Sequence, residues 1–308
     1  MPENSKMGPF PGPILSLLAH VRPCVIKPAG YLFTYFYLTG VFFPGSITGI
    51  WAQLAIISGH LAFSIFALLV ARGAHRTANH FLYFVRLLLA AIAVEVVSFF
   101  ASRHLAIYFG QRNALFTYAA SLSLIAGISM AVGCYHDMVS QVVPADGGWS
   151  KKGLFGVPVN PGNYKMAPIP GMVLGLLTAG LSIFVTVYFD FSEGLFGLLF
   201  IVLMFLALRD EATPKHHKLR QNIYRGEKEY PRAIIYSAAL AGVFILVSMI
   251  TKRFDMSRLF VYLAPVAATL LLGVLLERKR APGKYLQYLS YAMLPLSVGL
   301  FCLIASLI

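Results

Sequence analysis

The sequence predicts an all-α fold, a polytopic bundle of about nine transmembrane helices with its N-terminus in the cytoplasm. Three observations predict this class. Hydrophobic residues make up 58% of the 308 residues and charged residues only 12%, whereas a soluble domain is about half apolar and a quarter charged. The mean hydropathy is +0.73. The apolar residues also gather in runs of about twenty, the length that crosses a bilayer as a helix.

These runs define nine predicted spans, separated by polar, charged or Gly/Pro-containing residues. The first span contains Pro28, and the sixth is short. Residues 1–24 form a separate polar N-terminal segment, in which an apolar stretch too short for a signal peptide predicts a short interfacial helix. Residues 25–308 are predicted to form one transmembrane helical domain. The nine spans are predicted at 25–44, 48–71, 80–101, 113–134, 168–189, 193–208, 232–251, 259–276 and 285–308.

The distribution of positive charge predicts the orientation of the chain. With the N-terminus inside, 19 of the 25 lysines and arginines fall in cytoplasmic segments and 5 in external loops. This bias is the positive-inside pattern of membrane proteins, and it explains the net charge of +13 without a nucleic-acid partner. It predicts an external C-terminus and an integral membrane protein surrounded by lipid.

Three polar residues within the predicted spans are the candidate catalytic residues. His60 lies near the middle of the second span, and Arg86 and Glu95 lie about 9 Å from the cytoplasmic and external ends of the third. A charge in hydrocarbon costs roughly 2.5–3.5 kcal/mol on insertion scales, so such residues mark a functional site by default. The structural alternatives are snorkelling for Arg86, a protonated packing role for Glu95 and structural hydrogen bonding for His60.

Basic residues in the cytoplasmic loops are the candidate donor-binding residues. They are Arg72, Arg76, Lys151 and Lys152, whose positive charge suits a lipid head group or the phosphates of a nucleotide-linked donor. The alternative is that these loops are solvated connectors whose charges only enforce topology. No metal site is predicted, because the three cysteines are scattered and the histidines of residues 75–80 have no recognised ligand spacing.

A resemblance to a known family covers about a fifth of the chain. Residues 59–95 read GHLAFSIFALLVARGAHRTANHFLYFVRLLLAAIAVE, and residues 112–118 read RNALFTY. This text resembles the TraX family of integral membrane proteins, whose members typically read GRxAFPxFAFLxxEGxxxTxNxxxYxxRLxxFAxxSE and then NxxFT. The matching residues are Gly59, Ala62, Phe63, Phe66, Ala67, Gly73, Thr77, Asn79, Tyr83, Arg86, Leu87, Glu95, Asn113, Phe116 and Thr117.

The resemblance implies acyl transfer, because the TraX family is similar to a wider group of transmembrane acyltransferases. These proteins take an acyl group from cytoplasmic acyl-CoA and deliver it across or onto the membrane. The resemblance also implies that this membrane is a bacterial inner membrane. By resemblance, Arg86 and Glu95 belong to the functional cavity, and the basic loops suit the phosphates of acetyl-CoA or another acyl-CoA. A histidine is the expected general base for this chemistry.

The chain also departs from the family pattern. The Asp-His pair that the family carries near the end of its first span falls at Tyr37 and Leu38. The family arginine and proline of the next span are replaced by His60 and Ser64, and a further family histidine near the C-terminus falls at Ser297. The sequence therefore leaves two candidate replacement bases, His60 and His20 of the predicted interfacial helix.

Three functions remain open from the sequence. The first is a membrane acyltransferase in which His60 acts as base or donor, Arg86 stabilises developing charge or binds donor phosphate, and Glu95 positions the acceptor. The second is a TraX-like subunit or scaffold that lacks this chemistry and binds other membrane subunits. The third is a transporter or flippase for a polar or lipid-linked solute.

Overall fold

The computed structural model describes residues 26–77, 80–105, 113–140, 168–208, 229–252, 255–275 and 284–307. Within these ranges the fold is all-helical, as predicted, and each helix coincides with one predicted span. The helices are α2 (Ile26–Phe42), α3 (Ile50–Arg76), α4 (His80–Leu105), α5 (Ala114–Ser140), α6 (Pro168–Tyr188), α7 (Gly194–Ala207), α8 (Glu229–Ile250), α9 (Met256–Leu275) and α10 (Lys284–Leu307).

Five of the described helices are long and apolar enough to cross a membrane, which indicates an integral membrane protein. These are α3, α4, α5, α6 and α8. Shorter apolar stretches occupy Gly194–Ala207, Arg258–Leu271 and Ala292–Leu307, and α2 has 17 residues. The count of nine spans and the cytoplasmic N-terminus stay predictions.

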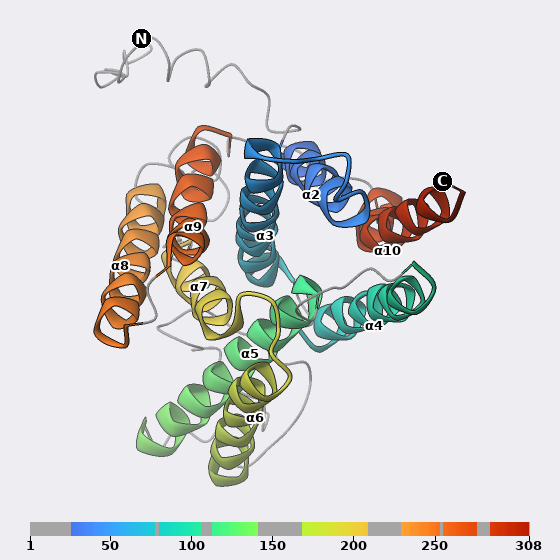
Figure 1. The fold of residues 1–308 in the computed structure, drawn as a ribbon. Coiled ribbons are helices and arrows are strands. Elements are labelled where there is room, and N and C mark those ends of the chain that lie inside the picture. Colours follow the sequence, from blue (N-terminus) through green and yellow to red (C-terminus); the bar gives the residue numbers. More distant parts are fainter. Residues whose placement is uncertain are drawn as a thin grey trace, which may run out of the picture.

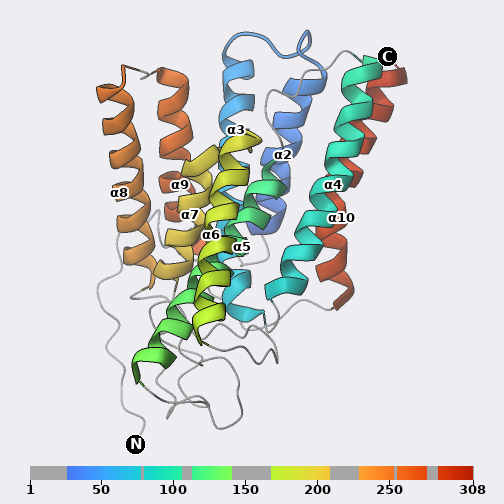
Figure 2. The ribbon, with the colours of Figure 1, turned by 90° about the horizontal axis from the view of Figure 1, so that it is seen from below.

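Successive described helices run in opposite directions, so the described chain enters the bundle at one end and leaves it at the other (Figure 2). Seen along the bundle, α7 lies among α3, α5, α6, α8 and α9, whereas α4 and α10 form one edge with α2 (Figure 1).

Two hydrophobic cores hold the described helices together. The larger core joins α3, α5 and α7 through side chains such as Leu68, Ile125 and Phe200, each 0–1% exposed. The smaller core joins α2, α4 and α10 through Leu38, Val94 and Val298. Burial in both cores leaves the remaining apolar faces, such as the outer side of α6, to face lipid.

The crossing of α5 and α6 is built from small residues. A methyl group at Gly175 would lie 2.6 Å from the carbonyl oxygen of Gly127 and 2.7 Å from the amide nitrogen of Ala131. Ala179 follows four residues after Gly175, and both are buried. This small-xxx-small spacing is the pattern that lets membrane helices bring their backbones into contact.

The elbow between α3 and α4 is also closely packed. The hydroxyl of Thr77 donates to the carbonyl of Gly73 at 2.8 Å. This bond joins the residue after α3 to the last turn of the helix. A methyl group at Gly73 would lie 2.8 Å from the hydroxyl oxygen of Tyr83, so glycine lets the start of α4 approach α3. Three residues of the family resemblance therefore meet at this elbow.

His75 joins the end of α3 to the end of α7. Its Nε2–H donates to the carbonyl oxygen of Phe205 at 2.5 Å, and its ring stacks on the Phe205 ring with centroids 4.1 Å apart. That carbonyl is one of the last four of α7, which have no partner within the helix. This hydrogen bond therefore joins two helices.

Replacing His75 with Phe is expected to lower the stability of the bundle by about 1 kcal/mol, because the stacking remains but the hydrogen bond is lost. Thermal unfolding in detergent measures this. His104→Phe is the matched control, since His104 stacks on Phe100 at an exposed site. Equal melting temperatures for the two variants would contradict the assignment.

Candidate functional site

A tight turn between α6 and α7 positions the candidate site. Figure 2 shows that this turn lies below the neighbouring ends of α2, α3 and α4, so it is set into the bundle. Asp190 and Glu193 adopt left-handed backbone conformations, with φ of 49° and 60°, and Gly194 follows with a φ of 48°. The amide of Gly194 donates to the carbonyl of Phe191 at 2.8 Å. The turn reverses the chain and directs the Glu193 carboxylate toward α3.

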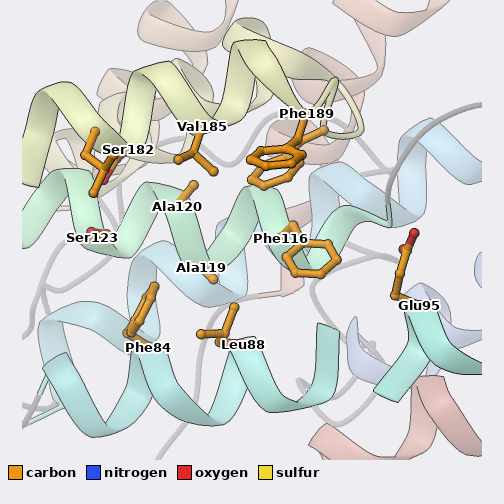
Figure 3. Close-up of a pocket in the computed structure, with 12 residues that line it drawn as sticks. Phe84, Leu88, Glu95, Phe116, Ala119, Ala120, Ser123, Ser182, Val185 and Phe189 are labelled. Carbon is orange, nitrogen blue, oxygen red and sulfur yellow. The ribbon is translucent and has the colours of Figure 1, made fainter. Parts of the chain in front are cut away.

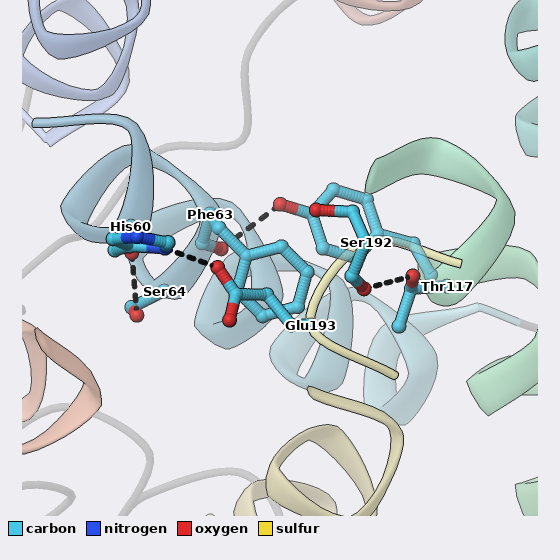
Figure 4. Close-up of polar contacts among 7 residues, drawn as sticks. His60, Phe63, Ser64, Thr117, Ser192 and Glu193 are labelled. Atoms are coloured by element: carbon cyan, nitrogen blue, oxygen red, sulfur yellow. Dashed lines mark hydrogen bonds and ion pairs between the residues drawn. The ribbon is translucent and has the colours of Figure 1, made fainter. Parts of the chain in front are cut away.

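The Glu193 carboxylate pairs with His60 of α3 (Figure 4). His60 Nδ1 lies 2.5 Å from Glu193 Oε1, and the two side chains are 23% and 7% exposed. A carboxylate only accepts, so Nδ1–H is the donor and Nε2 of a neutral imidazole is left as an acceptor. Nε2 makes no hydrogen bond to any described residue. This is the arrangement of a base held in one tautomer by an acid.

Backbone hydrogen bonds fix the elements around this pair (Figure 4). The Thr117 hydroxyl donates to the carbonyl of Ser192 at 2.6 Å, and the Tyr118 hydroxyl donates to the carbonyl of Phe63 at 2.9 Å. Both donors lie near the start of α5, so α5 is joined to α3 and to the α6–α7 turn. The Ser64 hydroxyl donates to the carbonyl of His60 at 2.8 Å.

Two glycines allow close packing beside the pair. A methyl group at Gly197 would lie 2.7 Å from the Phe63 ring, so α7 approaches α3 just after Glu193. A methyl group at Gly59 would lie 2.7 Å from the Tyr37 ring, which brings α2 against the residue before His60. Both contacts limit how far the His60 helix can shift.

Glu95 lies in a second polar cluster at the start of α5. Asn113 Nδ2 donates to Glu95 Oε2 at 3.2 Å and to the carbonyl of Ala91 at 3.0 Å. Asn113 Oδ1 also accepts from the amide of Leu115 at 3.1 Å, which satisfies one of the free amides that begin the helix. The structure therefore brings together two residues of the family resemblance, and Glu95 is tied to the beginning of α5.

An apolar cavity of about 430 Å³ lies between α4, α5 and α6, with Glu95 at one end (Figure 3). Phe84 and Leu88 line it from α4, Phe116 lines it from α5, and Phe189 and Phe191 line it from the α6–α7 turn. Phe116 stacks on Phe191 with centroids 5.2 Å apart. The turn therefore presents aromatic rings to the cavity and the Glu193 carboxylate to His60.

The other predicted site residues lie elsewhere or outside the described residues. Arg86 is half-buried on α4 and interacts with other groups of the protein. It is not among the described residues that line the cavity. Arg72 is half-buried near the end of α3, and Arg76 ends that helix. Lys151, Lys152 and the alternative base His20 lie outside the described residues.

The positions at which the family carries histidines lie in or beside the smaller core. Leu38 is 4% exposed there, packed with residues of α4 and α10. Ser297 is buried on α10 and its hydroxyl donates to the hydroxyl oxygen of Tyr35 at 3.2 Å. Packing between α2 and α10 thus occupies these positions, while His60 lies on α3 and faces Glu193.

Sequence reasoning missed Glu193, the partner of His60. Its signal was the text DFSEG, in which two acids lie in a short connection between apolar runs although the chain has only 12 acids in all. Among the described residues, no three His, Cys, Asp or Glu side chains lie close enough to hold a metal ion.

The fold and the two polar clusters define a membrane-embedded helical bundle with a paired histidine and an adjoining apolar cavity. Comparisons of the chain with protein-family models, with curated proteins and with solved structures find no match. The resemblance to the TraX family therefore stays a prediction from the quoted residues.

Proposed function

We propose that the protein is a TraX-like membrane acyltransferase that moves an acetyl or other acyl group from cytoplasmic acyl-CoA to a membrane-associated or translocated acceptor. The observation that carries the proposal is the His60–Glu193 pair, which leaves Nε2 without a described partner on a side chain that is 23% exposed. A base oriented by a carboxylate is the arrangement that acyl transfer uses to activate a hydroxyl or amine.

In this reaction His60 Nε2 takes the proton of the acceptor hydroxyl or amine, while the oxygen or nitrogen of that group attacks the thioester carbonyl carbon. The new acyl bond forms, the carbon–sulfur bond breaks, and the proton passes from His60 to the leaving thiolate. Glu193 keeps Nδ1 protonated and stabilises the imidazolium that forms in between. Its burial, at 7% exposed, strengthens this interaction because the local dielectric is low.

The donor would approach from the other end of α3. His60 and Arg72 are twelve residues apart on this helix, which corresponds to about 18 Å. The extended thioester arm of CoA has to bridge this distance while its phosphates stay with the basic end of α3, where Arg76 also lies. Arg72, Arg76, Lys151 and Lys152 remain the proposed donor-binding residues.

One observation favours the second candidate, a TraX-like subunit without acyl-transfer chemistry. The two positions where the family resemblance expects histidines are Leu38, which is buried in the smaller core, and Ser297, which is bonded to Tyr35. A family site centred there would be filled by packing side chains. In that case the chain would serve as a scaffold for other membrane subunits, and the His60–Glu193 pair would be structural.

Acyl transfer by membrane vesicles separates these candidates. Vesicles that contain the wild-type protein are expected to transfer label from radiolabelled acetyl-CoA into the membrane fraction. His60→Ala is expected to reduce the transfer about 10²–10⁴-fold, the usual contribution of a positioned general base. His104→Ala, at an exposed histidine outside the site, is expected to behave as wild type.

Two results would decide against the proposal. Equal labelling with wild-type vesicles and with vesicles that lack the protein would leave the scaffold as the better candidate. Full activity of a folded His60→Ala variant would remove His60 from the chemistry.

A further inference from the structure

The cavity between α4, α5 and α6 has walls made almost entirely of hydrocarbon. Its polar lining residues are Glu95, Ser123 and Ser182. The Ser182 hydroxyl donates to the carbonyl of Thr178 at 2.8 Å, and Asn113 holds Glu95 at one end. Aromatic and aliphatic groups form the rest of the wall (Figure 3). Such walls suit a hydrocarbon ligand and offer little to a nucleotide.

The cavity is open on the side that faces lipid. Leu181 and Phe189 line it and are also 62% and 48% exposed. They belong to the same outer surface as Leu177 and Phe184 of α6, which are 64% and 59% exposed. Because α4, α5 and α6 are all long and apolar enough to cross a membrane, this surface lies at the depth of the acyl chains.

The size of the cavity fits one acyl chain. Its volume of about 430 Å³ lies within the range of about 300–1,000 Å³ for small-molecule sites. Phe84 and Glu95, which line it from α4, are eleven residues apart, which corresponds to about 16 Å along the helix. If the cavity were empty, the side chains of its walls would lose dispersion contacts. Lipid hydrocarbon at the opening of the cavity can restore these contacts.

We propose that this cavity binds one acyl chain of a membrane phospholipid, which enters from the bilayer beside Leu181 and Phe189. The inference concerns a site distinct from the His60–Glu193 pair and holds whether or not the protein transfers acyl groups. The bound acyl chain fills the space between α4, α5 and α6.

Phospholipid retention by two neighbouring variants tests the proposal. The protein is reconstituted in phosphatidylcholine nanodiscs, extracted into detergent, washed and weighed by native mass spectrometry. Wild type is expected to retain one phospholipid. Leu88→Trp places a larger ring in the cavity and is expected to lose most of the bound phospholipid. Leu89→Trp makes the same change at the next residue of α4, which is 62% exposed, and is expected to retain it.

A second measurement uses the wild-type protein alone, so its result does not depend on whether the Leu88→Trp variant folds. Nanodiscs that contain phosphatidylcholine with a photoreactive diazirine in one acyl chain are irradiated, and the labelled residues are mapped. Labelling is expected at Phe84, Leu88 and Phe116. Labelling confined to the outer face of α6, at Leu177 and Phe184, would overturn the proposal, as would equal phospholipid retention by Leu88→Trp and Leu89→Trp.

Discussion

Leucine in place of Gly175 is expected to separate α5 from α6 and to prevent the bundle from reaching its folded state. The first atom of the new side chain would lie 2.6 Å and 2.7 Å from backbone atoms of α5. Overpacking in a core usually costs about 1–3 kcal/mol, and here the obstacle is backbone that cannot change rotamer. We therefore expect a loss of at least about 3 kcal/mol, seen as aggregation on size exclusion or as a lowered melting temperature in detergent.

Gly180→Leu is the matched control for this prediction. Gly180 lies on the same helix, and a methyl group there would meet open space. This variant is expected to be as stable as wild type. If Gly175→Leu melted at the same temperature as Gly180→Leu, the close crossing of α5 and α6 would be wrong.

Substitutions at Glu193 are expected to separate its proposed catalytic role from its structural role. Glu193→Gln keeps a carbonyl that can accept from Nδ1–H, so the loss of stability is expected to stay below about 1 kcal/mol. The amide cannot stabilise an imidazolium and can donate to Nδ1, which favours the wrong tautomer. Acyl transfer is therefore expected to fall at least about 10²-fold. Activity of the purified protein and its unfolding curve are the two measurements.

Glu193→Ala removes the partner entirely and is expected to cost about 3 kcal/mol of stability. The double variant with His60→Ala gives the coupling between the two side chains, expected at about 1.5–3 kcal/mol for a hydrogen bond to a charged group. Asp190→Ala is the control, because this acid lies in the same turn but is exposed. A stable but inactive Glu193→Gln supports the general-base proposal, whereas a fully active one contradicts it.

The positions of the helices could be predicted because membrane spans depend on local composition. Apolar runs of about twenty residues mark them, whatever they pack against. The predicted ends were less accurate. α3 continues to Arg76 and α5 continues to Ser140, past the predicted ends at residues 71 and 134. In both cases the helix extends into polar residues, where hydropathy gives no signal although the backbone hydrogen bonds continue.

The pairing of polar residues could not be predicted in the same way. His60 and Glu193 are 133 residues apart, and their meeting depends on the left-handed turn before α7 and on the packing of α7 against α3. Neither feature has a local pattern. The sequence did single out His60 and Glu95 as polar residues within predicted spans. In the structure His60 contacts Glu193, and Glu95 accepts a hydrogen bond from Asn113.

The brevity of α7 has a consequence for how the protein is made. Its 14 residues extend about 21 Å, less than the hydrocarbon thickness of about 30 Å, and most of its side chains are buried against other helices. During synthesis α7 emerges before α8 and α9, which later cover it. A segment too short to span the hydrocarbon gains little free energy from moving out of the translocon into lipid by itself. We therefore expect α7 to insert only after α3 and α5 have assembled beside the translocon.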